Sequence, residues 1–218
     1  ADKLDIIYAG DGNDTVRVGS DFNTDVLDGG IGDDTISFVW YGYENDSGVE
    51  FLLSDATDFE NIEGSFYDDI LHGDSNANYI SGDNAEAQYN GEGSDYLYGY
   101  AGNDTLLGMG GDDVIDGGSG SDRIITGDGS DTIVLRSGDG GFDIFDADTV
   151  VDFVGGQDVI SLSGQLLYSD LIIEQGVGEY AADTVISSGS EYLMVLSDTN
   201  AENISYEDFT DLNNVPSG

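Results

Sequence analysis

Aliphatic residues recur along this sequence once every nine positions, and glycine-rich polar stretches separate them. The pattern is most regular from residue 90 to residue 134. There, five consecutive nonapeptides each carry Gly at the fourth position, Asp at the sixth and a branched aliphatic residue at the eighth. A six-residue turn followed by a three-residue strand fits this spacing. The pattern predicts an all-β fold, a right-handed parallel β-roll (β-solenoid) in which each nonapeptide forms half a coil.

The eighth position supplies the predicted core. Successive side chains of a strand point to opposite faces, so the seventh and ninth positions of a unit face outward and the eighth faces inward. Two facing sheets would stack the inward residues into a thin core. These residues are Val16, Leu27, Ile36, Leu71, Ile80, Leu97, Leu106, Ile115, Ile124 and Ile133.

The repeats divide into two blocks separated by a segment without the period. Residues 1–37 are predicted to form a first β-roll block, and residues 64–136 a second one. Residues 38–63 lack the nonapeptide, and we expect them to be an insertion that packs back on the roll. Within the second block, residues 82–89 lack both the Asp and the aliphatic residue, and we interpret them as a distorted half-turn.

Residues 137–218 follow a different pattern. Three alternating runs, LIIEQ, DTVIS and YLMVLSD, are separated by turns that contain Gly, and they predict antiparallel strands. An uncapped solenoid exposes an apolar cross-section and unpaired strand edges. We therefore expect this region to be a β-rich cap that closes one end of the roll.

Charge narrows the range of partners. The chain has 46 acidic and 4 basic residues, and its formal net charge is −42. Phosphate groups and anionic lipids repel such a chain, so we expect neither nucleic-acid binding nor membrane insertion. The partners that we expect are calcium ions, with an extracellular glycan or surface ligand as a further candidate. We expect the segment to be monomeric. The start at ADKLD and the end at NNVPSG suggest a segment of a longer protein.

The Asp at the sixth position is the candidate metal ligand. Equivalent residues recur once per full coil on each edge of the roll, so their carboxylates should stack roughly 4.8 Å apart. At that distance each pair repels by about 0.9 kcal/mol in water and by about 3.5 kcal/mol at an effective dielectric constant of 20. A Ca²⁺ ion between coils would replace this repulsion by attraction. Ca²⁺ accepts a shell of carboxylate and carbonyl oxygens more readily than Mg²⁺ does.

Glycines at the first, second and fourth positions complete the predicted sites, because they allow positive φ and let carbonyls approach an ion. In the regular block, ions are expected between Asp95 and Asp113, between Asp104 and Asp122, and between Asp113 and Asp131. The full set of candidate metal-binding residues is Gly10, Gly12, Asp14, Asp25, Gly30, Gly32, Asp34, Asp69, Asn78, Gly91, Gly93, Asp95, Gly99, Gly102, Asp104, Gly108, Gly111, Asp113, Gly117, Gly118, Gly120, Asp122, Gly127, Gly129, Asp131, Asp148 and Asp152.

Metal binding is expected to decide whether the chain folds. A thin core is too small to offset both chain entropy and the repulsion of the stacked carboxylates. Folding should therefore be coupled to Ca²⁺ binding, and the chain should be disordered without the ion. At ten times its dissociation constant each independent site adds only about 1.4 kcal/mol, so several sites must act together.

The units GGIGDDTIS and GGSGSDRII resemble the RTX, or haemolysin-type, calcium-binding repeats, whose consensus is GGxGxDxUx with U a large aliphatic residue. Asn78, in place of Asp, and Met109, in place of Gly, depart from it. The resemblance implies several bound Ca²⁺ ions, type I secretion and an extracellular location.

The segment DTVVDFVGGQDVISLS is similar to the region that follows such repeats in serralysin-type proteins. By that resemblance Asp148, Asp152 and Asp158 would complete an ion site where the roll meets the cap. An equal alternative is that they serve as turn and capping residues.

Catalytic motifs are missing from the sequence. It contains neither HExxH nor GxSxG, and its single histidine, His72, has no evident catalytic partner. We therefore predict a protein without enzymatic activity of its own.

Two other functions stay open. If residues 82–89 form one half-turn, Tyr79, Tyr96 and Tyr98 lie on one outer face, where they could bind a glycan as in an adhesin or be covered by the rest of the chain. Alternatively, the segment is the accessory C-terminal domain of a secreted hydrolase.

Overall fold

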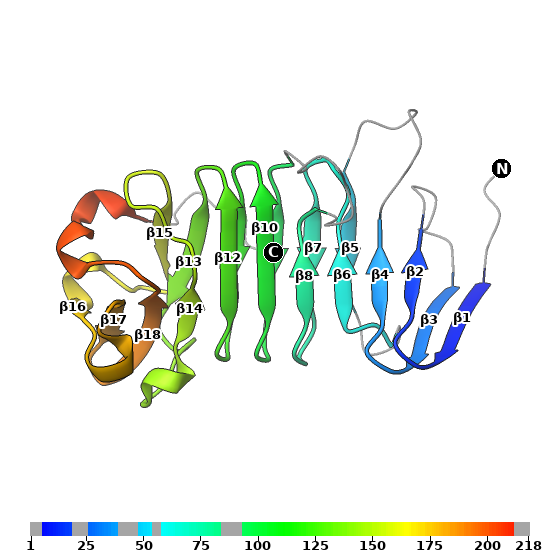
Figure 1. Cartoon of the computed structure of the whole chain (residues 1–218), viewed down its shortest axis with the longest axis horizontal. Coiled ribbons are helices and arrows are strands. Elements are labelled where there is room, and N and C mark those ends of the chain that lie inside the picture. The colour runs from blue at the N-terminus through cyan, green and yellow to red at the C-terminus, as the bar shows by residue number, and fades with distance from the viewer. Residues whose placement is uncertain (1–5, 19–25, 39–47, 54–57, 84–92, 212–218) are drawn as a thin grey trace.

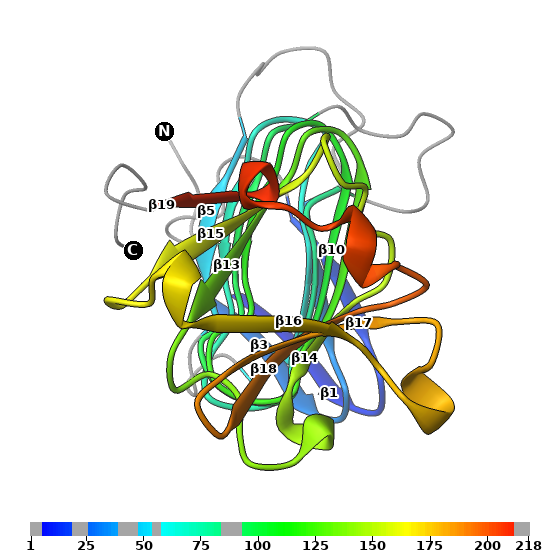
Figure 2. The same ribbon diagram turned by 90° about the vertical axis from the view of Figure 1, so that its left-hand side faces the viewer.

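Short parallel strands lie side by side along one long axis (Figure 1). The computed structural model describes residues 6–18, 26–38, 48–53, 58–83 and 93–211. Viewed along that axis, two sheets form facing walls and the turns form the edges between them (Figure 2). These features confirm the predicted all-β parallel β-roll.

Two large sheets and a small one contain the described strands. The larger is, in spatial order, β16 (Leu171–Gln175), β17 (Thr184–Ser188), β18 (Glu191–Leu196), β14 (Asp148–Val150), β12 (Arg123–Asp128), β10 (Thr105–Gly110), β8 (Tyr79–Ser81), β6 (Asn61–Glu63), β4 (Thr35–Ser37) and β2 (Thr15–Arg17). The facing sheet is β19 (Phe209–Asp211), β15 (Val159–Ser163), β13 (Thr132–Arg136), β11 (Val114–Asp116), β9 (Tyr96–Tyr98), β7 (Ile70–His72) and β5 (Glu50–Leu52). The small sheet pairs β1 (Ile6–Asp11) with β3 (Val26–Ile31). Below, the two large sheets are the ten-stranded and the seven-stranded sheet.

The predicted inward positions build the core. Strand register sets Leu106 opposite Ile124 in one sheet and Leu97 opposite Ile115 in the other, so equivalent residues stack from coil to coil. All four of these side chains are fully buried. Leu27 is the exception among the predicted core residues, since it is only partly buried against the cluster.

The segment 38–63 differs from the predicted insertion. Strand β5 pairs in register with β7, and β6 lies between β4 and β8, so the segment contributes one strand to each large sheet. Ile62 is fully buried in the core, and Phe51 packs against it. These two side chains occupy the inward position, which explains why the segment joins the roll without the Gly and Asp of the consensus. The aromatic residues at 40, 41 and 43 lie outside the described residues.

The interpretation of 82–89 as a distorted half-turn concerns a segment of which residues 84–89 lie outside the described residues. Ladder residues in neighbouring coils are 18 residues apart in the regular block, as between Asp95 and Asp113, but 26 apart between Asp69 and Asp95. The difference equals the length of 82–89. The described strands on either side, β8 and β9, belong to opposite sheets and keep parallel register with the neighbouring coils.

The C-terminal part both extends and covers the roll. Strands β14 and β15 lie beyond residue 137, yet they continue the two large sheets in parallel register. Strand β17 runs antiparallel to β16 on one side and to β18 on the other, as predicted for the cap. They cross one end of the roll (Figure 2).

Single-turn 3₁₀ helices connect the later strands at Ile144–Asp146, Tyr168–Asp170, Gly178–Tyr180, Ala201–Asn203 and Tyr206–Asp208. Among the described residues, no helix is both long enough and apolar enough to cross a membrane.

Truncation of one inward side chain should weaken the whole roll. Ile115 is fully buried between Leu97 and Ile133, so Ile115→Ala should lower the free energy of unfolding by roughly 2–5 kcal/mol, as cavity-forming substitutions do. Ile31, which is 74% exposed, is the matched control, and Ile31→Ala should cost less than about 0.5 kcal/mol. Urea unfolding in excess calcium measures both. Equal losses would contradict the assigned core.

Candidate metal centres at the edges of the roll

Acidic residues form one ladder along each edge of the roll. Each ladder residue directly precedes a strand, except Asp148, which is the first residue of β14, and successive members of a ladder come from successive coils. The first ladder lies in the turns that enter the seven-stranded sheet and consists of Asp69, Asp95, Asp113, Asp131 and Asp158. The second ladder lies in the turns that enter the ten-stranded sheet and consists of Asp14, Asp34, Glu60, Asn78, Asp104, Asp122 and Asp148.

In both ladders, backbone N–H groups of one coil hold ladder carboxylates of the next. The Asp95 N–H donates to Asp113 Oδ1 at 2.8 Å, and the Asp113 N–H donates to Asp131 Oδ1 at 2.9 Å. The same bond joins Asp104 to Asp122 in the second ladder, at 2.8 Å. The structure thus brings together the three pairs of residues that the sequence analysis expected to share an ion.

The second carboxylate oxygen of these residues has no hydrogen-bond donor among the described residues, although it is buried. A buried ionised oxygen without a partner is costly, because it has lost water and gained nothing in exchange. A cation is the natural partner for an acceptor-only group. The oxygens concerned are the Oδ2 atoms of Asp34, Asp95, Asp104, Asp113, Asp122 and Asp131.

Backbone carbonyls face the same spaces as these oxygens. A side chain added at Gly108 would collide with both Asp113 Oδ2 and the Thr126 carbonyl oxygen, and one added at Gly99 would collide with Asp104 Oδ2 and the carbonyl of residue 117. A carboxylate and a carbonyl oxygen therefore converge above each of these glycines. Such an oxygen set fits Ca²⁺. No three acidic or histidine side chains in the described part of the chain converge on a metal position, so carbonyls must supply much of any shell.

Burial makes the ladder carboxylates weak acids. Burial first, and after it the charge of ladder neighbours, raises the pKa of Asp95 and of Asp113 to about 8. The same causes raise the pKa of Asp104 to about 7. The backbone N–H bonds oppose these shifts but do not cancel them. At neutral pH the metal-free ladder is therefore electrostatically unfavourable, and a bound divalent cation would reverse this balance.

The candidate glycines shape the turns. Gly118 has φ of +89° at the second position of its unit, where a side chain would collide with the Tyr100 carbonyl group. Met109 stands at an equivalent position with φ of +78°, a conformation that costs energy for a residue with Cβ. Gly91 and Asp25 lie outside the described residues. The other candidate glycines with positive φ are Gly10, Gly12, Gly30, Gly102, Gly111, Gly120, Gly127 and Gly129.

The three aspartates expected at the junction of roll and cap belong to different arrangements. Asp148 extends the second ladder, because Asp148 Oδ1 accepts the N–H of Asp122 at 2.9 Å. Asp158 extends the first ladder on the other edge, where it accepts the N–H of Asp131 at 3.2 Å. Asp152 accepts the N–H of Thr126 with one oxygen and that of Gly127 with the other. The three therefore do not converge on one ion, and Asp152 caps a turn.

Two ladder positions depart from Asp. Glu60 was missed by the sequence analysis, but its Oε2 accepts the Asp34 N–H at 2.7 Å and it stands two residues before the inward Ile62. That spacing from the inward residue was the signal that identifies it. Asn78 uses its Oδ1 to accept the Asp74 N–H and its Nδ2 to donate to the Glu60 carbonyl, so it brings no free carboxylate oxygen.

The predicted tyrosine patch is not formed as expected. Tyr79 lies in the ten-stranded sheet, whereas Tyr96 and Tyr98 lie in the seven-stranded sheet. Instead, the His72 ring stacks on Tyr98 with centroids 4.8 Å apart and planes inclined by 9°. A hydrogen bond of 2.9 Å joins His72 Nδ1 to the hydroxyl of Tyr100, which is 45% exposed.

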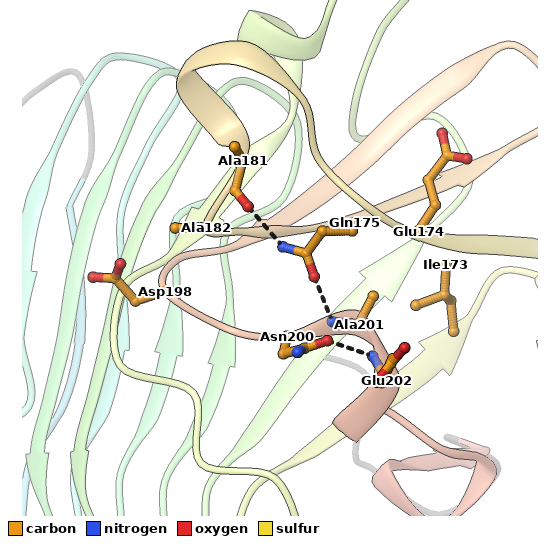
Figure 3. Close-up of a pocket in the computed structure, with 9 residues that line it drawn as sticks. All are labelled: Ile173, Glu174, Gln175, Ala181, Ala182, Asp198, Asn200, Ala201 and Glu202. Atoms are coloured by element: carbon orange, nitrogen blue, oxygen red, sulfur yellow. Dashed lines mark hydrogen bonds between the residues drawn. The ribbon is translucent and has the colours of Figure 1, made fainter.

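The cap contains an open hollow of about 700 Å³ (Figure 3). Gln175 spans it, since its amide donates to the Ala181 carbonyl and its Oε1 accepts the Ala201 N–H at 3.1 Å. These hydrogen bonds satisfy the amide of Gln175, so the hollow lies where this side chain links segments of the cap. Its lining consists of Ile173, Glu174, Gln175, Ala181, Ala182, Asp198, Asn200, Ala201 and Glu202.

Several solved structures are similar to this chain. The extracellular lipase LipA of Serratia marcescens is 14% identical over 96% of this chain, which spans 38% of the lipase chain, with a TM-score of 0.45. The R2 and R3 subunits of the AlgE6 mannuronan C5-epimerase of Azotobacter vinelandii are each 27% identical. They cover 72% and 66% of this chain, and 96% and 78% of their own, with TM-scores of 0.39 and 0.32. The sequence matches none of the curated proteins compared with it.

One family model matches the repeats themselves. The model of the RTX calcium-binding nonapeptide repeat matches residues 3–24, 24–37, 57–85, 89–124 and 108–145, together more than half of the chain. The matched segments contain ladder residues of both edges. The chain belongs to the family of RTX calcium-binding nonapeptide repeat proteins.

Proposed function

We propose that this chain is a non-catalytic calcium-binding module of a protein exported by type I secretion. In this proposal the module is disordered in the absence of Ca²⁺ and folds outside the cell when it binds several ions. The observation that carries the proposal is the set of buried ladder oxygens that lack a hydrogen-bond donor among the described residues. A further proposal, compatible with the first, is that the module is the accessory domain of a secreted hydrolase.

The ladder residues are the proposed ligands. Asp113 takes part in two pairs, with Asp95 on one side and Asp131 on the other, so its carboxylate would contribute to ions above and below its own coil. The carbonyl oxygens of residues 117 and 126 would add to the shells. When bound, the ion supplies the positive charge that the stacked carboxylates need. Asp152 is proposed to act as a turn cap.

Coupling of binding to folding follows from the ladder geometry. The ladder oxygens converge only when successive coils are stacked, so the unfolded chain presents no comparable site. Ions that bind the folded form alone stabilise it by mass action, and several sites add their contributions. The folded fraction should therefore rise steeply over a narrow range of calcium concentration.

Removal of calcium should unfold the chain. We expect a largely disordered circular-dichroism spectrum after metal is stripped with EDTA, and a cooperative change to β-structure at millimolar calcium. Magnesium at the same concentration should restore far less β-structure, because Mg²⁺ resists exchanging its water for carbonyl oxygens. A well-folded metal-free protein would refute the proposed function.

Acid should partly replace calcium. The folded pKa of about 8 for Asp95 and Asp113 lies above the ordinary value of 3.8. The stability from these groups is therefore fully present below about pH 4 and is lost as the pH rises through about 8. Metal-stripped protein should gain β-structure when the pH falls from 8 to 5, as circular dichroism would record.

Salt provides the control for this pH effect. High NaCl at pH 8 screens exposed charges but not buried ones, so it should restore much less β-structure than acid does. A metal-free spectrum that stays disordered down to pH 5 would contradict the assigned burial of the ladder.

Glycan binding is a second candidate function, favoured by the exposed ring of Tyr100 beside His72 and Tyr98. These rings present much of their faces to one another, which limits the area left for a sugar. If a glycan binds, Tyr98→Ala combined with Tyr100→Ala should weaken it at least about tenfold on a glycan array in calcium, since ring stacking would be lost. Tyr8→Ala, exposed and remote on β1, is the control. Unchanged binding by the double variant would rule out this surface.

A further inference from the structure

The turn between β8 and β9 contains a buried carboxylate outside the ladder. Asp83 follows Gly82 at the start of this turn and has no exposed surface. Neither of its carboxylate oxygens has a hydrogen-bond partner among the described residues. Asp83 was not among the predicted ligands, because its unit lacks the consensus spacing. A fully buried acid with two unpartnered oxygens requires a compensating positive charge or a proton.

The preceding coil shows what this turn position ordinarily does. Ser65 follows Gly64 as Asp83 follows Gly82, and the Ser65 hydroxyl donates to Asp69 Oδ1 at 2.9 Å. The Ser65 N–H donates to the other oxygen of Asp69 at 2.6 Å. An ionised Asp83 has no proton to donate. Correspondingly, Asp95, the ladder residue of the same turn as Asp83, keeps a buried Oδ2 without a donor.

Asp83 lies close to the carboxylates of the first ladder, to which Asp95 belongs. Asp83 is close enough for its charge to raise the pKa of both Asp95 and Asp113. A side chain at Gly82 would collide with Asp95 Oδ2 and would approach the Gly108 carbonyl oxygen at 2.8 Å. Carboxylate and carbonyl oxygens therefore gather at the beginning of this turn, as they do above Gly108 in the next coil.

The other described turns of the first ladder have no carboxylate at the equivalent position, which is occupied by Ser65, Met109, Gly127 and, in the turn that ends at Asp158, Phe153. Asp152 lies in that last turn, but both of its carboxylate oxygens accept backbone N–H groups. Calcium sites become tighter as the number of charged ligands increases. A turn with two carboxylates should hence attract the ion more strongly than a turn with one.

We propose that Asp83 and Asp95 bind one Ca²⁺ ion together in the turn between β8 and β9, and that this two-carboxylate site fills before the other sites of the roll. The inference rests on the proposed calcium-dependent folding and adds to it a ligand outside the repeat consensus.

Calcium titration of the whole chain tests the inference. Asp83→Asn and Asp83→Ser each remove the extra charge, and the second reproduces the residue of the preceding coil. Isothermal titration calorimetry should show the tightest class of binding weakened at least about tenfold in both variants. Asp128→Asn removes the same charge from an exposed residue at the end of β12, and its titration should overlay that of the unmodified chain. Circular dichroism at 10 mM calcium should show that all variants fold.

Every outcome bears on the inference. Titrations of Asp83→Asn and Asp83→Ser that superimpose on the unmodified chain overturn it, while calcium-dependent folding of that chain stands. Failure of the unmodified chain to bind calcium overturns the proposed function as well. If both variants fail to fold at 10 mM calcium, Asp83→Glu decides. It keeps the charge and should fold with the tightest class retained, whereas its failure would show that packing alone requires Asp83.

Discussion

The roll depends on a carboxylate that is only half satisfied. In each regular turn one oxygen of the ladder aspartate is fixed by a backbone N–H of the neighbouring coil, as Asp113 is by Asp95. The other oxygen is buried without a described donor. Because the first contact fixes the position of the second oxygen, the hydrogen bonding of the turn itself creates a site for a positive charge. Without that charge, burial opposes ionisation of the ladder carboxylates, and their ionisation at neutral pH destabilises the fold.

One spacing serves both the core and the ladders. The inward residue stands two positions after the ladder residue, so a strand that buries Ile115 also sets Asp113 at the edge. The spacing between the ladder position and the inward position is consequently under strong constraint, whereas turn length is not. The offset between coils grows from 18 residues, between Asp104 and Asp122, to 26 residues, between Asp122 and Asp148, without loss of register.

The sequence predicted what the period encodes and missed what depends on three-dimensional context. The inward aliphatic residues and the paired aspartates followed directly from the nonapeptide. Strands β5 and β6 did not, because Phe51 and Ile62 keep the inward position while the glycines that mark a repeat are absent. The expected alignment of Tyr79 with Tyr96 depended on counting residues 82–89 as a half-turn, and the two residues lie in different sheets, which a one-dimensional pattern does not reveal. Asp83 required knowledge of burial and of missing donors, which only the assembled coils provide.

The ladder bonds have a direction. In every described case the backbone donor belongs to the earlier coil and the accepting carboxylate to the later one, and the last acceptors, Asp148 and Asp158, come from the region that also leads into the cap. The two ends of the module are therefore different. Loss of a coil on the N-terminal side removes the N–H donors of the next ladder residues, as Asp113 Oδ1 would lose the N–H of Asp95. Loss of the last coil instead leaves the N–H groups of Asp122 and Asp131 without their acceptors, so one end of a shortened roll carries unpartnered carboxylates and the other unpartnered amides.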